Sequence, residues 1–184
     1  MRSFKYIFVL CFVVFLFSCD NAVQQVNSIK ISEGEIQPIV FKEKSWGSVE
    51  LGSNIKNNPY LIRIEESYVP DESCYYVSKT GEWSESEPDV KVVNNKVAAI
   101  ESTIPFTTDY YGISVGDNEK VIYEKIDGNF FDKIENDDPD VSNQYFVVVW
   151  SSLKKEYGVK YNIVNNLIVE ISIGTSEVVY SGCV

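Results

Sequence analysis

The sequence contains no histidine among its 184 residues, and this absence limits the chemistry that is open to the protein. Histidine is the most common general base and metal ligand, and the side chain whose ordinary pKa lies between about pH 5 and 8. Basic residues are also scarce, since 16 Lys and Arg stand against 27 Asp and Glu. Nucleic-acid binding requires clustered Lys and Arg, so we expect no nucleic-acid partner.

Long apolar runs are missing except at the N-terminus, where Tyr6 to Phe17 follow the basic residues Arg2 and Lys5. A basic start before about 7–15 apolar residues is typical of a secretory signal, whereas a membrane-spanning helix needs about 20. The run ends in Leu16-Phe17-Ser18-Cys19, which has the lipobox order of aliphatic, variable and small residue before cysteine. We predict cleavage before Cys19 and lipid on its thiol. The alternatives are a chance cysteine behind an ordinary signal, or an uncleaved anchor.

The predicted product is a bacterial lipoprotein with a signal peptide at 1–18, a lipidated tether at 19–35 and one domain at 36–184. The domain would face the periplasm or the exterior, and Asp20 leaves the choice of inner or outer membrane open. Without the signal, the chain has 14 basic and 27 acidic side chains and a net charge of −13. Such a chain would not adhere to anionic lipid by charge, so we expect the acyl chains to provide its membrane contact.

Cysteine is also rare, with four in the chain. Cys11 leaves with the signal and Cys19 takes the lipid, so Cys74 and Cys183 remain. In the oxidising envelope these two predict a disulfide, and the alternative is two separate buried thiols. The loop it would close, of about 110 residues, corresponds to at most roughly 4–5 kcal/mol of stabilisation.

Valine, isoleucine and aromatic residues are abundant, which favours strands. The sequence also contains a weak internal repeat. Three segments recur 64 or 71 residues later: Val49–Ser53 resembles Ile113–Asp117, Cys74–Val77 matches Tyr145–Val148, and Val92–Asn95 resembles Ile163–Asn166. We therefore predict two tandem units within the domain, at about 45–104 and 108–184.

Each unit is expected to contain a helix followed by antiparallel strands. In the second unit, Asp117 or Asn118 can cap a helix whose apolar face is Val121, Ile122 and Ile126, with Gly128 at its end. In the first unit, Pro59 interrupts the corresponding helix over Ser53–Glu65.

Two hairpins are predicted by pairs of asparagine, which tolerates the left-handed backbone of tight turns. Asn94-Asn95 separates Asp89–Val93 from Lys96–Glu101, and a strand at Tyr145–Trp150 belongs to the second unit. There, Asn165-Asn166 separates the last two expected strands, Tyr157–Val164 and Leu167–Ile173. We expect an α+β fold in which short helices back an antiparallel sheet.

Four motifs resemble a group of uncharacterised bacterial lipoproteins: Gly112-Ile113-Ser114-Val115-Gly116, Cys74-Tyr75-Tyr76, Val93-Asn94-Asn95-Lys96-Val97-Ala98-Ala99-Ile100 and Gly182-Cys183. The unit plan also resembles outer-membrane assembly lipoproteins of the SmpA/OmlA type and the tandem units of the β-lactamase inhibitor protein. The resemblance covers about residues 45–184. It implies binding or scaffolding rather than catalysis.

No motif carries a convincing catalytic or metal site. Ser151-Ser152-Leu153-Lys154 and Lys79-Thr80-Gly81 imitate serine β-lactamase signatures, but their order in the chain is reversed. The acidic loop Glu135–Asp140 lacks the glycine and distal glutamate of a helix–loop–helix calcium site, so a solvated loop is favoured. We expect no catalytic residue, no metal and no cofactor, and we predict that the protein is not an enzyme.

Four aromatic residues border predicted turns and are candidate partner-binding residues: Trp46, Trp83, Tyr110 and Tyr111. Aromatic side chains are favoured anchors in protein interfaces. The alternative is that they cover the edges of the core.

Three functions follow from these features. The first is a non-catalytic lipoprotein that binds another envelope protein in an assembly or accessory role. The second is an inhibitor or immunity protein against a toxin or hydrolase. The third is a small carboxylate enzyme, which would require a concave pocket with carboxylates of raised pKa.

Overall fold

The computed structural model describes residues 38–65, 73–126, 131–135 and 143–176, within a compact unit that spans Gln37–Val184. Three predictions fall outside the described residues: the signal peptide, the tether with Cys19, and the end of the second helix at Gly128. Most of the acidic loop Glu135–Asp140 and Cys183 also lie outside them.

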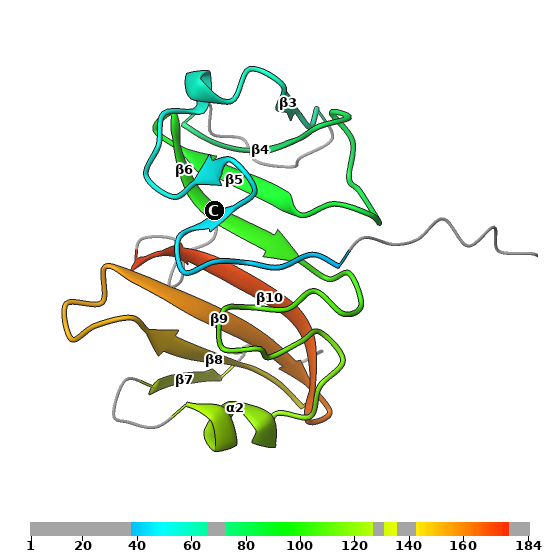
Figure 1. The fold of residues 1–184 in the computed structure, drawn as a ribbon, viewed down its shortest axis with the longest axis vertical. Helices are drawn as coiled ribbons and strands as arrows, with labels where there is room; N and C mark the ends of the chain where they lie inside the picture. The colour runs from blue at the N-terminus through cyan, green and yellow to red at the C-terminus, as the bar shows by residue number, and fades with distance from the viewer. Residues whose placement is uncertain (1–37, 66–72, 127–130, 136–142, 177–184) are drawn as a thin grey trace, which may run out of the picture. The chain divides into compact units, whose positions relative to one another are not determined.

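Within the described residues, one antiparallel sheet of eight strands organises the fold (Figure 1). The strands are β3 (Ile62–Arg63), β4 (Cys74–Ser78), β5 (Asp89–Val93), β6 (Lys96–Ser102), β7 (Phe131–Glu135), β8 (Gln144–Trp150), β9 (Tyr157–Val164) and β10 (Leu167–Thr175). Their order across the sheet is β3-β4-β5-β6-β10-β9-β8-β7. A separate small hairpin consists of β1 (Ser45–Trp46) and β2 (Val49–Glu50).

The expected α+β class is wrong, because the fold is dominated by strands. In the described part of the chain there are one six-residue helix, α2 (Lys120–Lys125), and one 3-10 turn, η1 (Ile55–Asn57). The expected helix over Ser53–Glu65 is reduced to η1. The Asn54 side chain accepts a hydrogen bond from the Lys56 N–H, and the turn ends at Asn58, directly before Pro59, because the residue before proline is disfavoured in helical backbone.

Both asparagine hairpins are confirmed. Asn94, Asn95, Asn165 and Asn166 have positive φ of 50°, 61°, 52° and 65°, as the two-residue turns that suit hairpins require. Strands β5 and β9 begin and end at the predicted residues. Each hairpin also contains a register shift close to its turn, next to Val92 in the first and Ile168 in the second.

Equivalent backbone hydrogen bonds occur in the two halves of the chain. The Gly52 N–H donates to the Val97 carbonyl at 2.7 Å, and the Gly116 N–H donates to the Ile168 carbonyl at 2.8 Å. The two donor glycines are 64 positions apart in the chain, and the two acceptor residues are 71 positions apart. Each half contributes four consecutive strands, and the halves join where β6 pairs with β10, with Glu101 opposite Ser172.

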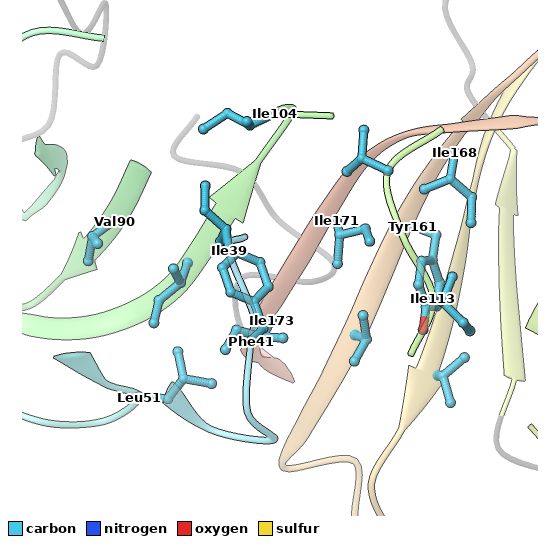
Figure 2. Close-up of a cluster of buried hydrophobic side chains, with 14 of the residues drawn as sticks. Ile39, Phe41, Leu51, Val90, Ile104, Ile113, Tyr161, Ile168, Ile171 and Ile173 are labelled. Carbon is cyan, nitrogen blue, oxygen red and sulfur yellow. The ribbon is translucent and has the colours of Figure 1, made fainter. Parts of the chain in front are cut away.

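The largest hydrophobic cluster of the described residues draws on both halves of the sheet (Figure 2). Ile100 and Ile173, which are opposite each other across the junction, are fully buried. Phe41 from the N-terminal part of the domain is fully buried in the same cluster. Burial of each such side chain contributes about 1.5–3 kcal/mol, so the shared core stabilises both halves together.

Candidate functional site

Large apolar side chains are exposed around strand β3, and we call this region the β3 surface: Tyr60, Ile62 and Trp83, with Trp46 and Lys79 beside them. The exposed fractions are 41% for Tyr60, 53% for Ile62 and 49% for Trp83. Scattered exposed apolar residues are normal, but a group of them indicates an interaction site.

A hollow of about 600 Å³ lies between β3 and the loop that follows β4. Residues 62–65 and 80–83 line it. Gly81 has a φ of +77°, and a Cβ built there would lie 3.0 Å from Cγ2 of Ile62. Glycine at this position therefore lets the loop pack closely against β3 and places Trp83 at the hollow.

A second hollow, of about 280 Å³, lies beside Trp46 and Tyr60 and is also lined by Lys79. The Tyr60 hydroxyl is 2.6 Å from the Ser48 hydroxyl, which fixes the phenol ring. The Lys79 ammonium lies 4.9 Å from the centre of the Trp46 ring and 2.8 Å from a Glu87 carboxylate oxygen. Lys79 and Thr80 are consecutive, so the chain that borders the second hollow continues directly into the wall of the first.

The four predicted aromatic residues do not form one cluster. Trp83 is half-exposed and contacts Tyr76 with tilted rings whose centres are 5.1 Å apart. Trp46, Tyr110 and Tyr111 are partly buried against the hydrophobic core, as the alternative interpretation expects. The rings of Tyr110 and Tyr111 contact each other, with centres 4.2 Å apart.

Sequence reasoning missed Tyr60, Ile62 and Lys79. Strand β3 has two residues, which is too short for any apolar alternation to be recognised. The dipeptide Pro59-Tyr60, which interrupts the expected helix over Ser53–Glu65, was the available signal, because it places an aromatic residue next to a helix-breaking proline.

A cluster of charged side chains lies on the sheet face opposite to the core. Asp89 on β5 is directly opposite Glu101 on β6, and Tyr76 on β4 is opposite Lys91. The Tyr76 hydroxyl donates to Oε2 of Glu101 at 3.1 Å, and the Lys91 ammonium lies 3.4 Å from Oε1. The Lys91 side chain is only 5% exposed.

Burial and mutual repulsion raise the pKa of several groups in this cluster. Burial, followed by the charge of Glu101, raises the pKa of Asp89 to about 6, although a hydrogen bond from the Ser84 backbone opposes the shift. Burial and the same charge raise the pKa of Glu170. The cluster has the raised carboxylate pKa values that the enzyme hypothesis requires, but neither hollow described above is lined by these residues.

Asp109 is a second buried carboxylate, and its partners indicate a structural role. The side chain is 2% exposed and accepts hydrogen bonds from the backbone N–H groups of Tyr111 and Ile113, each at 2.9 Å. It also accepts one from the Tyr161 hydroxyl. Burial raises the pKa of Asp109, and these hydrogen bonds oppose the rise. The carboxylate thus holds the turn at residues 109–113 onto strand β9.

The remaining site predictions fall only in part on residues that the structure describes. Cys74 is disulfide-bonded, and its pairing with Cys183 stays a prediction because Cys183 lies outside the described residues. No group of three or more His, Cys, Asp or Glu that could hold a metal ion occurs in the described segments. Among those same segments, no helix has the length and apolar character needed to cross a membrane.

Comparison with protein-family models, curated proteins and solved structures found no match, so the resemblance to envelope lipoproteins and to the β-lactamase inhibitor protein stays a prediction.

Proposed function

We propose that this chain is a non-catalytic lipoprotein of the bacterial envelope, which binds another envelope protein through the β3 surface. The observation that carries the proposal is the exposure of Ile62 and Trp83 on opposite walls of one hollow. Interfaces are enriched in aromatic residues, and their strongest contacts come from side chains that fill pockets on the partner. The lipobox at Cys19 supports the envelope location.

In vivo photo-cross-linking tests this proposal. A photoreactive amino acid replaces Ile62 or Trp83 in the full-length lipoprotein, and cells are irradiated before the products are identified by mass spectrometry. The matched control is Leu153, which is 83% exposed and lies in the connection between β8 and β9. We expect one resident envelope protein to be captured from positions 62 and 83 and not from position 153.

Two results would contradict the proposal. One is the absence of any product from positions 62 and 83, and the other is an equal set of products from all three positions. Capture of an exogenous toxin or hydrolase would instead support the inhibitor hypothesis.

A further inference from the structure

Within the described residues, β3 is the outer strand of the sheet and pairs with β4 alone. Arg63 is opposite Val77, and the Ile64 N–H donates to the Tyr76 carbonyl at 2.9 Å. In an antiparallel pair, alternate residues direct both N–H and C=O toward the partner strand. Ile64 is the residue that faces β4 in this way. The N–H and C=O of its neighbour Arg63 therefore point away from β4.

The residues of β3 are exposed, and the backbone of the following loop approaches the Arg63 carbonyl, since a Cβ built at Gly81 would lie 3.6 Å from that oxygen. Ile62, Arg63 and Glu65 are all exposed. Outside the β3–β4 pairing, no backbone hydrogen bond to the N–H or C=O of Arg63 occurs within the described part of the chain. Such an edge is a template for pairing with another extended chain.

The hollow beside this edge favours a basic side chain. Glu65 and Glu82 line it, and Trp83 offers an aromatic face that is half exposed. The guanidinium of Arg63 lies 4.7 Å from the centre of the Tyr75 ring and is thus engaged by that ring. A lysine or arginine from an incoming strand would meet two carboxylates and an indole, which favour it by charge and by cation–π attraction.

We propose that β3 accepts an extended segment of the partner protein as an additional strand, with a basic side chain of that segment in the hollow beside Trp83. This inference rests on the proposed function and specifies the kind of segment that is bound. A backbone hydrogen bond from the Arg63 N–H supplies part of the affinity, and the hollow supplies the preference for a basic residue.

The probe is a capped hexapeptide of alternating lysine and valine, and its binding to the full-length lipoprotein in detergent is measured by surface plasmon resonance. We expect a dissociation constant below 1 mM, and binding at least tenfold weaker for the hexapeptide of alternating glutamate and valine. Two further versions carry N-methyl groups on all valines or on all lysines. Because one edge of a strand presents alternate N–H groups, we expect one of these versions to bind at least fivefold more weakly than the other.

Protein variants separate strand pairing from simple charge attraction. Arg63→Pro removes the outward N–H without removing a bond to β4, and proline is tolerated on an edge strand. Arg63→Thr removes the same charge but keeps the N–H, so it is the matched control. We expect Arg63→Pro to bind the lysine–valine peptide at least fivefold more weakly than Arg63→Thr, with circular dichroism confirming that both fold.

A second pair of variants tests the hollow. Glu82→Gln is expected to weaken peptide binding at least threefold, whereas Glu50→Gln, on β2, should have no effect. Equal affinities for the two Arg63 variants, equal affinities for the two N-methylated peptides, or no binding at 1 mM would each overturn strand addition. Cross-linking of a partner at positions 62 and 83 would survive any of these results, so the failure of this inference is distinguishable from the failure of the proposed function.

Discussion

At the scale of the residue, Asp89 is the group whose protonation most directly links this fold to pH. Its pKa is raised from 3.8 to about 6 by burial and by the facing charge of Glu101. The folded protein therefore holds a proton at a pH where the unfolded chain has lost it. The contribution of Asp89 to stability is therefore greatest below about pH 4 and is lost as the pH rises to about 6.

We expect Asp89→Asn to raise the free energy of unfolding at pH 7 and to leave it nearly unchanged at pH 4. Asparagine is neutral and can still accept the hydrogen bond from the Ser84 backbone. Urea unfolding at pH 4, 5, 6 and 7 measures the effect, and Glu85→Gln in the exposed loop is the control. Because the pKa of Glu170 is also raised, part of the decrease in unfolding free energy with rising pH remains in Asp89→Asn. If the unfolding free energy of Asp89→Asn changed with pH between 4 and 6 as steeply as that of the wild type, the assignment to Asp89 would be disproved.

The Tyr161 hydroxyl offers a test of the other buried carboxylate. Tyr161→Phe removes a donor to Asp109 and leaves a buried oxygen with fewer partners. We expect a loss of about 1–3 kcal/mol in the free energy of unfolding. Tyr123→Phe is the control, because Tyr123 is 52% exposed. A loss from Tyr161→Phe that is no larger than the control would show that the hydrogen bond adds little.

At the scale of the element, the hairpins and the second helix, found as α2, could be predicted, whereas the first helix could not. Asn94-Asn95 and Asn165-Asn166 specify their turns locally, because asparagine accepts positive φ more readily than most residues. The first helix depended on Ser53–Glu65, where Asn54, Asn58 and Pro59 favour turns and caps over helix interiors. Local sequence decides turns of two residues, whereas a short helix requires tertiary packing to become stable.

The second hairpin turn provides the element-scale prediction. Asn166 has a φ of 65°, which glycine adopts freely and valine resists. We expect Asn166→Gly to leave the midpoint of thermal unfolding unchanged or higher, and Asn166→Val to lower stability by about 1–2 kcal/mol. The opposite responses to the two substitutions serve as the internal control. Destabilisation of equal size by both would point to a lost side-chain contact rather than to backbone conformation.

At the scale of the whole molecule, the candidate site was only partly predictable. Trp46 and Trp83 were found because aromatic residues beside turns stand out in the sequence. Ile62 was not, because its exposure depends on the register between β3 and β4 and on the approach of Gly81. Such a surface is created by contacts between segments about 20 residues apart, and no periodicity in the sequence encodes it.

The proposed lipid anchor at Cys19 predicts how the protein is held at the membrane. The chain after residue 18 has a net charge of −13, so charge cannot attach it to anionic lipid. We expect the protein to stay in the membrane fraction through a 1 M NaCl wash, to be released by detergent and to incorporate labelled palmitate.

Cys19→Ser should abolish both the labelling and the membrane retention, whereas Cys11→Ser should change neither, because Cys11 lies in the predicted signal peptide. Release of the wild-type protein by salt alone would refute a lipid anchor. Retention of Cys19→Ser in a detergent-extractable form would instead indicate an uncleaved signal. Because a membrane-held protein meets its neighbours at high effective concentration, we also expect Cys19→Ser to lose the cross-link from position 62 even though the β3 surface is intact.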